Sequence, residues 1–173
     1  MVEATPVAIS VPAQAILAEL ERIGITDVVN VPDTHQRTLL AALARQSRIR
    51  LLTVATEDEA IGVSAGLYVG GRRPLVLIQQ TGLLAALNNI KGIALDGCIP
   101  TCMLVGYFGR DLTRPARANA ARVTRLIEPT LDAWEIPYFG LETPDDLHVI
   151  EAAYRTAFER RGPSVVLVGA PTC

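Results

Sequence analysis

Polar side chains follow four apolar runs of the sequence, in each case where a strand would end. The four turns are residues 32–35 (PDTH), 56–59 (TEDE), 79–82 (QQTG) and 107–110 (YFGR). They offer carboxylates, an imidazole, amides and a guanidinium, which are groups that transfer protons or bind anions. Because ligands in open α/β sheets gather beyond the carboxyl ends of the strands, we expect these turns to share one edge of a sheet and to form a site.

Glu57 stands between an apolar run, residues 51–55, and a helical pattern near residues 58–70. The positive end of a helix dipole favours a carboxylate at this position. Acidic residues are also common in first helical turns, and the adjacent Asp58 and Glu59 offer the same chemical group. The pattern alone therefore leaves two interpretations of Glu57, a catalytic carboxylate and a helix cap.

The elements that must position these turns alternate along the chain. Apolar runs predict strands at residues 27–31, 51–55, 75–78, 101–105, 136–140 and 164–168, and helical patterns lie near 13–23, 39–43, 58–70, 84–95, 116–134 and 144–161. Runs such as LVLI, CMLV and SVVLVG lack polar alternation, which is typical of parallel strands covered on both faces. We predict an α/β fold, a doubly wound six-stranded parallel sheet with helices on both faces, with residues 1–173 as a single domain.

Two local features qualify this pattern. Pro129 lies inside the helical pattern 116–134 and is expected to kink or split that helix. Residues 107–120 are rich in arginine and form the only long loop that the sequence predicts.

The composition and the missing motifs exclude several classes of protein. The 173 residues are 50% hydrophobic and 20% charged, with a net charge of −2 and no domain-wide basic face, so we expect no nucleic-acid binding. No apolar run reaches the ~18 residues that a membrane span needs. Three cysteines without a charged-then-apolar leader favour a reducing compartment, the cytoplasm. Phosphate-binding loops, zinc spacings and the hydrolase Gly-x-Ser-x-Gly turn are all missing from the sequence.

The stretch TEDEAIGVSAGLYVGGRRPLVLIQQTGLLAALNNI, residues 56–90, resembles the pyrimidine-binding domain of thiamine-diphosphate enzymes, especially sulfopyruvate and phosphonopyruvate decarboxylases. In that family a glutamate after a strand is followed by a small-residue helix, a glycine, a second strand and a Gln-x-(Ser/Thr)-Gly-Leu turn. The resemblance runs from VVNVPDT to IPYF and covers nearly the whole chain. It implies the alpha subunit of a two-subunit decarboxylase that converts 3-sulfopyruvate, 3-phosphonopyruvate or a related 2-oxo acid into an aldehyde.

The resemblance assigns the catalytic glutamate of the family to Glu57. Its implied role is a hydrogen bond to N1′ of the aminopyrimidine of thiamine diphosphate, which favours the imino tautomer that accepts the C2 proton of the thiazolium. Asp33, Thr34 and His35 match the family's loop that reaches into the site. The resemblance implies that all three contact the substrate and that Thr34 and His35 are catalytic. Turn chemistry alone would make Asp33 or Thr34 a helix cap.

The turn of residues 79–82 matches the lining of the cofactor pocket in related chains. The resemblance implies that Gln79, Gln80, Thr81 and Gly82 bind the cofactor and that Gln80 also contacts the substrate. Relatives with histidine at the position of Gln80 have a proton donor that this chain lacks. Ordinary turn polarity is the alternative explanation of these side chains.

Arginines crowd the predicted loop at the same edge. Guanidinium groups suit sulfonate, phosphonate and carboxylate groups, and we expect Arg110 to bind the substrate. Arg114 and Arg117 lie nearby in the sequence. The alternative for all three is an exposed arginine that contacts only water.

A complete enzyme of this family also has a second domain, in which a Gly-Asp-Gly segment and an asparagine bind Mg²⁺ and through it the diphosphate. This chain is too short to hold both domains, and its residues 95–97 (LDG) lie at a predicted helix end. The resemblance therefore implies a separate beta-type subunit that binds the diphosphate and Mg²⁺. It also implies self-association through the pyrimidine-binding domains, and no metal ligands in this chain.

Other functions remain open on the sequence. A carboligase of the same fold would join the decarboxylated fragment to an acceptor in place of a proton. A catalytically silent assembly or binding subunit would keep the fold and only support a partner. A free-standing binder of a small ligand would need no partner chain at all.

Overall fold

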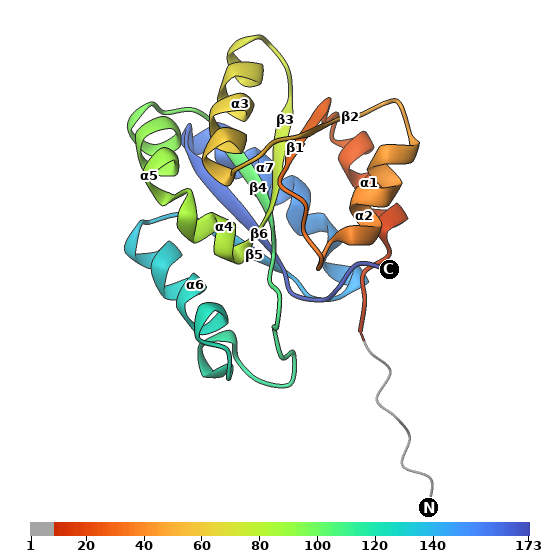
Figure 1. Ribbon diagram of the computed structural model, residues 1–173, viewed down its shortest axis with the longest axis vertical. Helices are drawn as coiled ribbons and strands as arrows, with labels where there is room; N and C mark the ends of the chain where they lie inside the picture. The colour runs from red at the N-terminus through yellow and green to blue at the C-terminus, as the bar shows by residue number, and fades with distance from the viewer. Residues whose placement is uncertain (1–8) are drawn as a thin grey trace, which may run out of the picture.

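Six parallel strands form the centre of the molecule in the computed structural model, which describes residues 9–173 (Figure 1). The strands are β1 (Asp27–Asn30), β2 (Arg50–Thr53), β3 (Pro74–Gln79), β4 (Thr101–Gly106), β5 (Tyr138–Leu141) and β6 (Pro163–Val168). Their order is β2-β1-β3-β4-β6-β5, and every neighbouring pair is parallel. The prediction of a doubly wound parallel sheet is confirmed.

Helices cover both faces of this sheet and divide the core into two clusters. One face carries α1 (Ala13–Arg22), α2 (Arg37–Arg45) and α7 (His148–Arg160). The other carries α3 (Glu57–Val69), α4 (Gln80–Ala85), α5 (Leu87–Asn89), the π-helix η1 (Ile90–Asp96) and α6 (Arg122–Ala133). The strands β4 and β6 are buried along their whole length, which explains why their sequences show no polar alternation.

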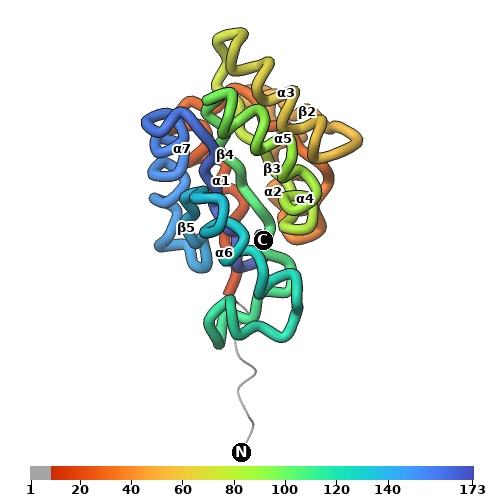
Figure 2. The backbone as a smooth tube through the Cα atoms, turned by 90° about the vertical axis from the view of Figure 1, so that its left-hand side faces the viewer, coloured from red at the N-terminus to blue at the C-terminus, as the bar shows by residue number. Residues whose placement is uncertain are grey.

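The sheet has a switch point between β1 and β3. These strands are neighbours, but the chain continues from β1 to the edge strand β2 and from β3 towards β4. In open α/β sheets the ligand-binding crevice lies at such a reversal, outside the carboxyl ends of the two strands. The turns that follow β1 and β3 border this crevice. The segment between β4 and α6 extends beyond the same edge (Figures 1 and 2).

Two predicted helices differ in extent from those observed. The pattern near 84–95 consists of three consecutive helices, α4, α5 and η1. The first of them begins directly after β3, where the extended residue Gln79 is the N-cap. The pattern 116–134 contains a 3₁₀ turn, η2 (Ala116–Ala118), then a break before α6. The helix does not split at Pro129, because the carbonyl that loses its partner belongs to Arg125, which is half buried and within reach of water.

The remaining short element is the 3₁₀ turn η3 (Pro144–Leu147), which leads into α7. Among residues 9–173, no helix combines the length and the apolar character that crossing a bilayer requires.

Candidate functional site

Glu57 lies at the start of α3 with its carboxylate against the backbone of Gly82 in α4. The approach is so close that a β-carbon at position 82 would overlap the carboxyl group. Glu57 is half buried, and within residues 9–173 no hydrogen bond or ion pair engages its carboxylate. The glycine therefore leaves room for a carboxylate that is free to accept or share a proton with a ligand.

The neighbouring acids have a different role. The side chain of Thr56 accepts a hydrogen bond from the Glu59 backbone N–H at 3.2 Å, and the Glu59 carboxylate accepts one from the Ala55 N–H at 2.9 Å. Asp58 is exposed. Thr56 is thus the N-cap of α3, and Glu57, although it lies in the first turn, bonds none of the N–H groups at this helix end.

The carboxylate of Asp33 is buried and links the turn after β1 to the ends of β3 and β4. One carboxylate oxygen accepts the His35 backbone N–H at 2.9 Å and the Gln79 amide at 3.2 Å, and the other accepts the Gln36 amide at 3.0 Å. The side chain is only 3% exposed and packs on Gly106, where a β-carbon would collide with it. The geometry makes Asp33 an organiser of the turn. A direct contact with an anionic substrate is disfavoured by its burial and its charge.

His35 is fixed from two directions. Its Nε2 lies 2.9 Å from the carbonyl oxygen of Val168, at the end of β6, and its own carbonyl accepts the Thr172 N–H at 3.3 Å. A carbonyl partner requires a proton on Nε2, so in the neutral ring Nδ1 is the acceptor. Thr34 beside it is exposed. The imidazole thus presents one defined nitrogen for proton transfer.

The side chains of residues 79–81 do not all face the same way. Thr81 is exposed and donates from its hydroxyl to the Gln79 side-chain oxygen at 3.1 Å. Through the amide of Gln79 this chain of hydrogen bonds reaches Asp33. Thr81 and Gln79 therefore remain accessible from the crevice.

The side chain of Gln80, unlike those of Gln79 and Thr81, forms hydrogen bonds with the loop after β4. Its Nε2 donates to the carbonyl oxygen of Phe108 at 2.6 Å, and its Oε1 accepts the Phe108 N–H at 2.9 Å. Only 1% of Gln80 is exposed. The predicted contacts of Gln80 with cofactor and substrate stay predictions. The observed partner is Phe108 of the turn 107–110, and the sequence did not predict this pairing, because no local pattern links residues on two different loops.

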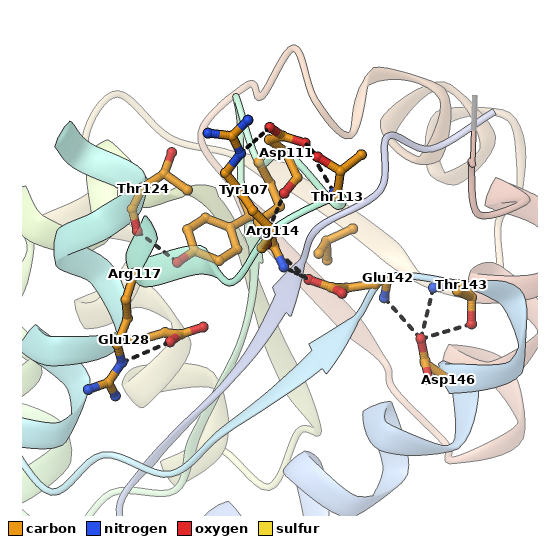
Figure 3. A network of polar contacts seen from close by, with 12 residues as sticks. Tyr107, Asp111, Thr113, Arg114, Arg117, Thr124, Glu128, Glu142, Thr143 and Asp146 are labelled. Atoms are coloured by element: carbon orange, nitrogen blue, oxygen red, sulfur yellow. Dashed lines mark hydrogen bonds and ion pairs between the residues drawn. The ribbon is translucent and has the colours of Figure 1, made fainter. Parts of the chain in front are cut away.

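The arginines of the loop after β4 form ion pairs with carboxylates of the protein itself (Figure 3). The Arg110 guanidinium donates to Glu142 from Nε at 2.9 Å, and its Nη2 forms an ion pair with the same carboxylate at 2.8 Å. Nη1 donates to the carbonyl oxygens of Asp111 and Arg114. Its side chain is only 7% exposed. Arg114 pairs with Asp111, and Arg117 with Glu128 and Asp132.

These contacts make Arg110 an anchor of the loop, and a substrate contact would require the pairing with Glu142 to open. Tyr107 reinforces the anchor, because its hydroxyl donates to the carbonyl oxygen of Thr124 at 2.8 Å (Figure 3). Burial raises the pKa of the Tyr107 hydroxyl well above its ordinary value, with a smaller contribution from the nearby Glu128. Tyr107 therefore acts as a neutral donor.

The residues that resemble a magnesium motif lie elsewhere. Asp96 ends the π-helix and pairs with Lys91 at 2.7 Å, whereas Asn119 is buried in the break before α6. In the part of the chain that the structure describes, no group of three or more His, Cys, Asp or Glu side chains could hold a metal ion. Asn89 donates to the carbonyl oxygen of Asp58 at 3.1 Å and links α5 to α3.

Comparison with known protein families identifies the domain. Residues 12–121 match the model of the thiamine pyrophosphate enzyme, N-terminal TPP binding domain. The chain belongs to this family. The matched segment contains Glu57, Gly82 and the turn after β1, so thiamine diphosphate (thiamine pyrophosphate) is the cofactor that this pyrimidine-binding site serves.

Several known decarboxylases are similar to this chain. The chain is 29% identical to the sulfopyruvate decarboxylase subunit alpha of Methanococcus maripaludis, over 91% of this chain and 94% of that protein. It is also 29% identical to the phosphonopyruvate decarboxylase of Streptomyces viridochromogenes, over 86% of this chain but 38% of that protein. Benzoylformate decarboxylase from Polynucleobacter necessarius has the same fold, with a TM-score of 0.72 and 18% identity over 91% of this chain and 29% of that one.

Proposed function

We propose that this chain is the alpha, pyrimidine-binding subunit of a two-subunit thiamine-diphosphate decarboxylase that acts on an anionic 2-oxo acid such as 3-sulfopyruvate or 3-phosphonopyruvate. The observation that carries the proposal is the unpaired Glu57 carboxylate held against Gly82, within a match to the family model. The similarity to an alpha subunit over 94% of its length supports the subunit assignment.

The residues at the carboxyl edge suit this cofactor and reaction. Bound thiamine diphosphate supplies the nucleophilic carbon and the electron sink for decarboxylation. Glu57 exchanges a proton with the aminopyrimidine ring, and the missing β-carbon of Gly82 lets the carboxylate reach it. Gln79 and Thr81 offer an amide and a hydroxyl to the ligand from the same crevice.

Proton transfer to the product needs a donor near the reacting carbon. His35 is the candidate in its imidazolium form, because Val168 fixes Nε2 and the second proton would be on Nδ1, the nitrogen left for a ligand. Thr34 is exposed beside it and contacts the substrate. Arg110 would bind an anionic substrate at this edge once its pairing with Glu142 opens.

The site is completed by another chain. We infer that a separate beta-type subunit binds the diphosphate and Mg²⁺ and that this chain, as a single domain, also associates with a second copy of itself. The helix α3 supports these contacts, since a β-carbon at Gly62 or Gly66 would meet open space and Val69 is exposed. The cysteines are free thiols, which suits a reducing compartment, and we place the protein in the cytoplasm.

The experiment is co-expression with the candidate beta subunit, followed by an aldehyde assay on 3-sulfopyruvate, 3-phosphonopyruvate and pyruvate with thiamine diphosphate and Mg²⁺. Turnover is expected only with both subunits, and the Glu57→Gln chain should lose it. Full activity of the Glu57→Gln chain would make this a silent assembly subunit. A carboligation product in place of the aldehyde would instead favour a carboligase, and tight binding of a small ligand by this chain alone would favour a free-standing binder.

A further inference from the structure

One large apolar side chain stands exposed at the carboxyl edge of the sheet. Phe108 follows the central strand β4, and 54% of it is exposed, whereas Tyr107 just before it is buried. The other large apolar residues exposed within residues 9–173 are Ile9, Val69 and Leu126. Phe108 is the only one of these that belongs to one of the four turns at the predicted ligand-binding edge.

The exposure of Phe108 does not come from a loose loop. The Gln80 side chain bonds both the N–H and the carbonyl of Phe108, as a neighbouring strand would, and the Thr124 hydroxyl donates to the same carbonyl at 3.3 Å. Gln80 is buried, so solvent does not compete for its two hydrogen bonds. The backbone of an exposed aromatic residue is thereby fixed by three hydrogen bonds, which is a costly arrangement for a surface side chain without a ligand.

The ring of Phe108 meets the imidazole of His35. The two ring centroids lie 6.4 Å apart with an interplanar angle of 89°, an edge-to-face contact. His35 is itself held by Val168. The phenyl ring therefore occupies a defined place beside the nitrogen to which we assign proton transfer.

The short helix α4 connects this ring to the catalytic carboxylate. Gln80 at its start holds Phe108, and Gly82 within it packs against Glu57. Two residues apart in a helix point to nearly opposite sides. The helix α4 thus contacts the Glu57 carboxylate through Gly82 and the loop that carries Phe108 through Gln80.

We propose that Phe108 determines substrate specificity: its ring forms one wall of the substrate pocket and restricts that pocket to compact 2-oxo acids. Gln80 is the positioning residue that holds the wall. A phenyl ring offers no hydrogen bond to a substrate, so its contribution is shape, and a bulky side chain on the 2-oxo acid collides with it. This inference rests on the proposed decarboxylase function.

The test uses the complete holoenzyme with both subunits, thiamine diphosphate and Mg²⁺. For wild type and Phe108→Ala, kcat/KM is measured with a compact substrate, pyruvate or 3-sulfopyruvate, and with a bulky one, benzoylformate. The ratio of bulky to compact kcat/KM should rise at least about tenfold in Phe108→Ala. Phe108→Leu should lie between, because it retains part of the volume. Leu126→Ala, which removes an exposed apolar side chain from α6, should leave the ratio unchanged.

A second measurement does not depend on turnover. Affinities for acetylphosphonate and benzoylphosphonate esters, which mimic the two substrates but lose no CO₂, should shift in the same direction. Gln80→Met keeps the length of the side chain and removes the amide, so it should shift both ratios less than Phe108→Ala. The double variant should equal Phe108→Ala, since the amide acts only through the ring.

The outcomes separate the two proposals. If the wild-type holoenzyme decarboxylates a compact 2-oxo acid but both ratios are unchanged in Phe108→Ala, the specificity role of Phe108 is wrong and the decarboxylase function stands. If the Gln80→Met effect adds fully to that of Phe108→Ala, the positioning role of Gln80 is wrong. If the wild-type holoenzyme decarboxylates no 2-oxo acid, the proposed function fails and the specificity role falls with it.

Discussion

The carboxylate of Glu57 lies against the α-carbon of Gly82, so that the glycine and the glutamate form one structural unit across two helices. The contact explains why this turn carries a glycine although its backbone conformation does not require one. A side chain at position 82 would occupy the space of the carboxylate. The position of Glu57 is therefore encoded at a site far from it in the sequence.

This contact makes Gly82→Ala a test of the position of Glu57. The added methyl group should displace the carboxylate and lower kcat of the holoenzyme by about 10²-fold or more, the usual range for the loss of a positioned acid or base. Steady-state kinetics measures the loss. Gly140→Ala is the matched control, because a β-carbon there meets no atom within 4 Å. Equal activity of both variants with wild type would show that the carboxylate can move without consequence.

The buried carboxylate of Asp33 should matter for stability more than for substrate affinity. In Asp33→Asn one of the three donors loses its acceptor, so the free energy of unfolding should fall by roughly 1–3 kcal/mol. Urea denaturation of the isolated chain measures this change. Asp58→Asn removes an exposed charge and should change stability little. A large rise in KM with unchanged stability would instead place Asp33 in contact with the substrate.

The sheet could be predicted from the sequence because its signal is local, whereas the catalytic role of Glu57 rests on the resemblance to a family and stays a prediction. Uninterrupted apolar runs identified the six strands, and the polar turns after four of them identified the edge. The roles of Gln80 and Arg110 could not be predicted in the same way. Their partners, Phe108 and Glu142, lie on other loops, and only the folded sheet brings them together.

The helix boundaries show the same limit on a smaller scale. The expected kink or split at Pro129 followed from the rule that a proline inside a helix removes one backbone hydrogen bond. Whether the freed carbonyl finds water depends on which face of α6 is exposed, and that is a tertiary property.

The pairing of Arg110 with Glu142 should keep the loop after β4 closed to proteases. Glu142→Ala leaves a nearly buried guanidinium without its carboxylate, so the loop should open more often. Limited digestion with trypsin should then cut faster after Arg117. Glu159→Ala removes an exposed partner of Arg155 and is the control. Digestion at the same rate in wild type and both variants would contradict the anchoring role of Glu142.

We expect Asp27, at the amino end of β1, to make the stability of the protein depend on pH. Its side chain is fully buried and pairs with Arg50 at 2.6 Å and Arg72 at 2.9 Å. Burial alone would raise the pKa of the carboxyl, but hydrogen bonds from Thr26, Arg72 and Arg50 outweigh burial and hold the pKa below its ordinary value. The folded state therefore binds this proton less readily than the unfolded chain does.

A lowered pKa of Asp27 in the folded state stabilises the protein above the unfolded pKa, about 3.9, and this contribution is lost as the pH falls through the folded value. Asp27→Asn should unfold more easily at pH 7 by roughly 1.5–3 kcal/mol, the range for hydrogen bonds to charged groups. The difference from wild type should shrink steadily below pH 4. Urea denaturation of both chains between about pH 2.5 and about pH 7, a range that includes the unfolded value of about 3.9, measures it. A difference that stays constant across this range would mean that the Asp27 carboxyl has the same pKa in the folded and unfolded chains.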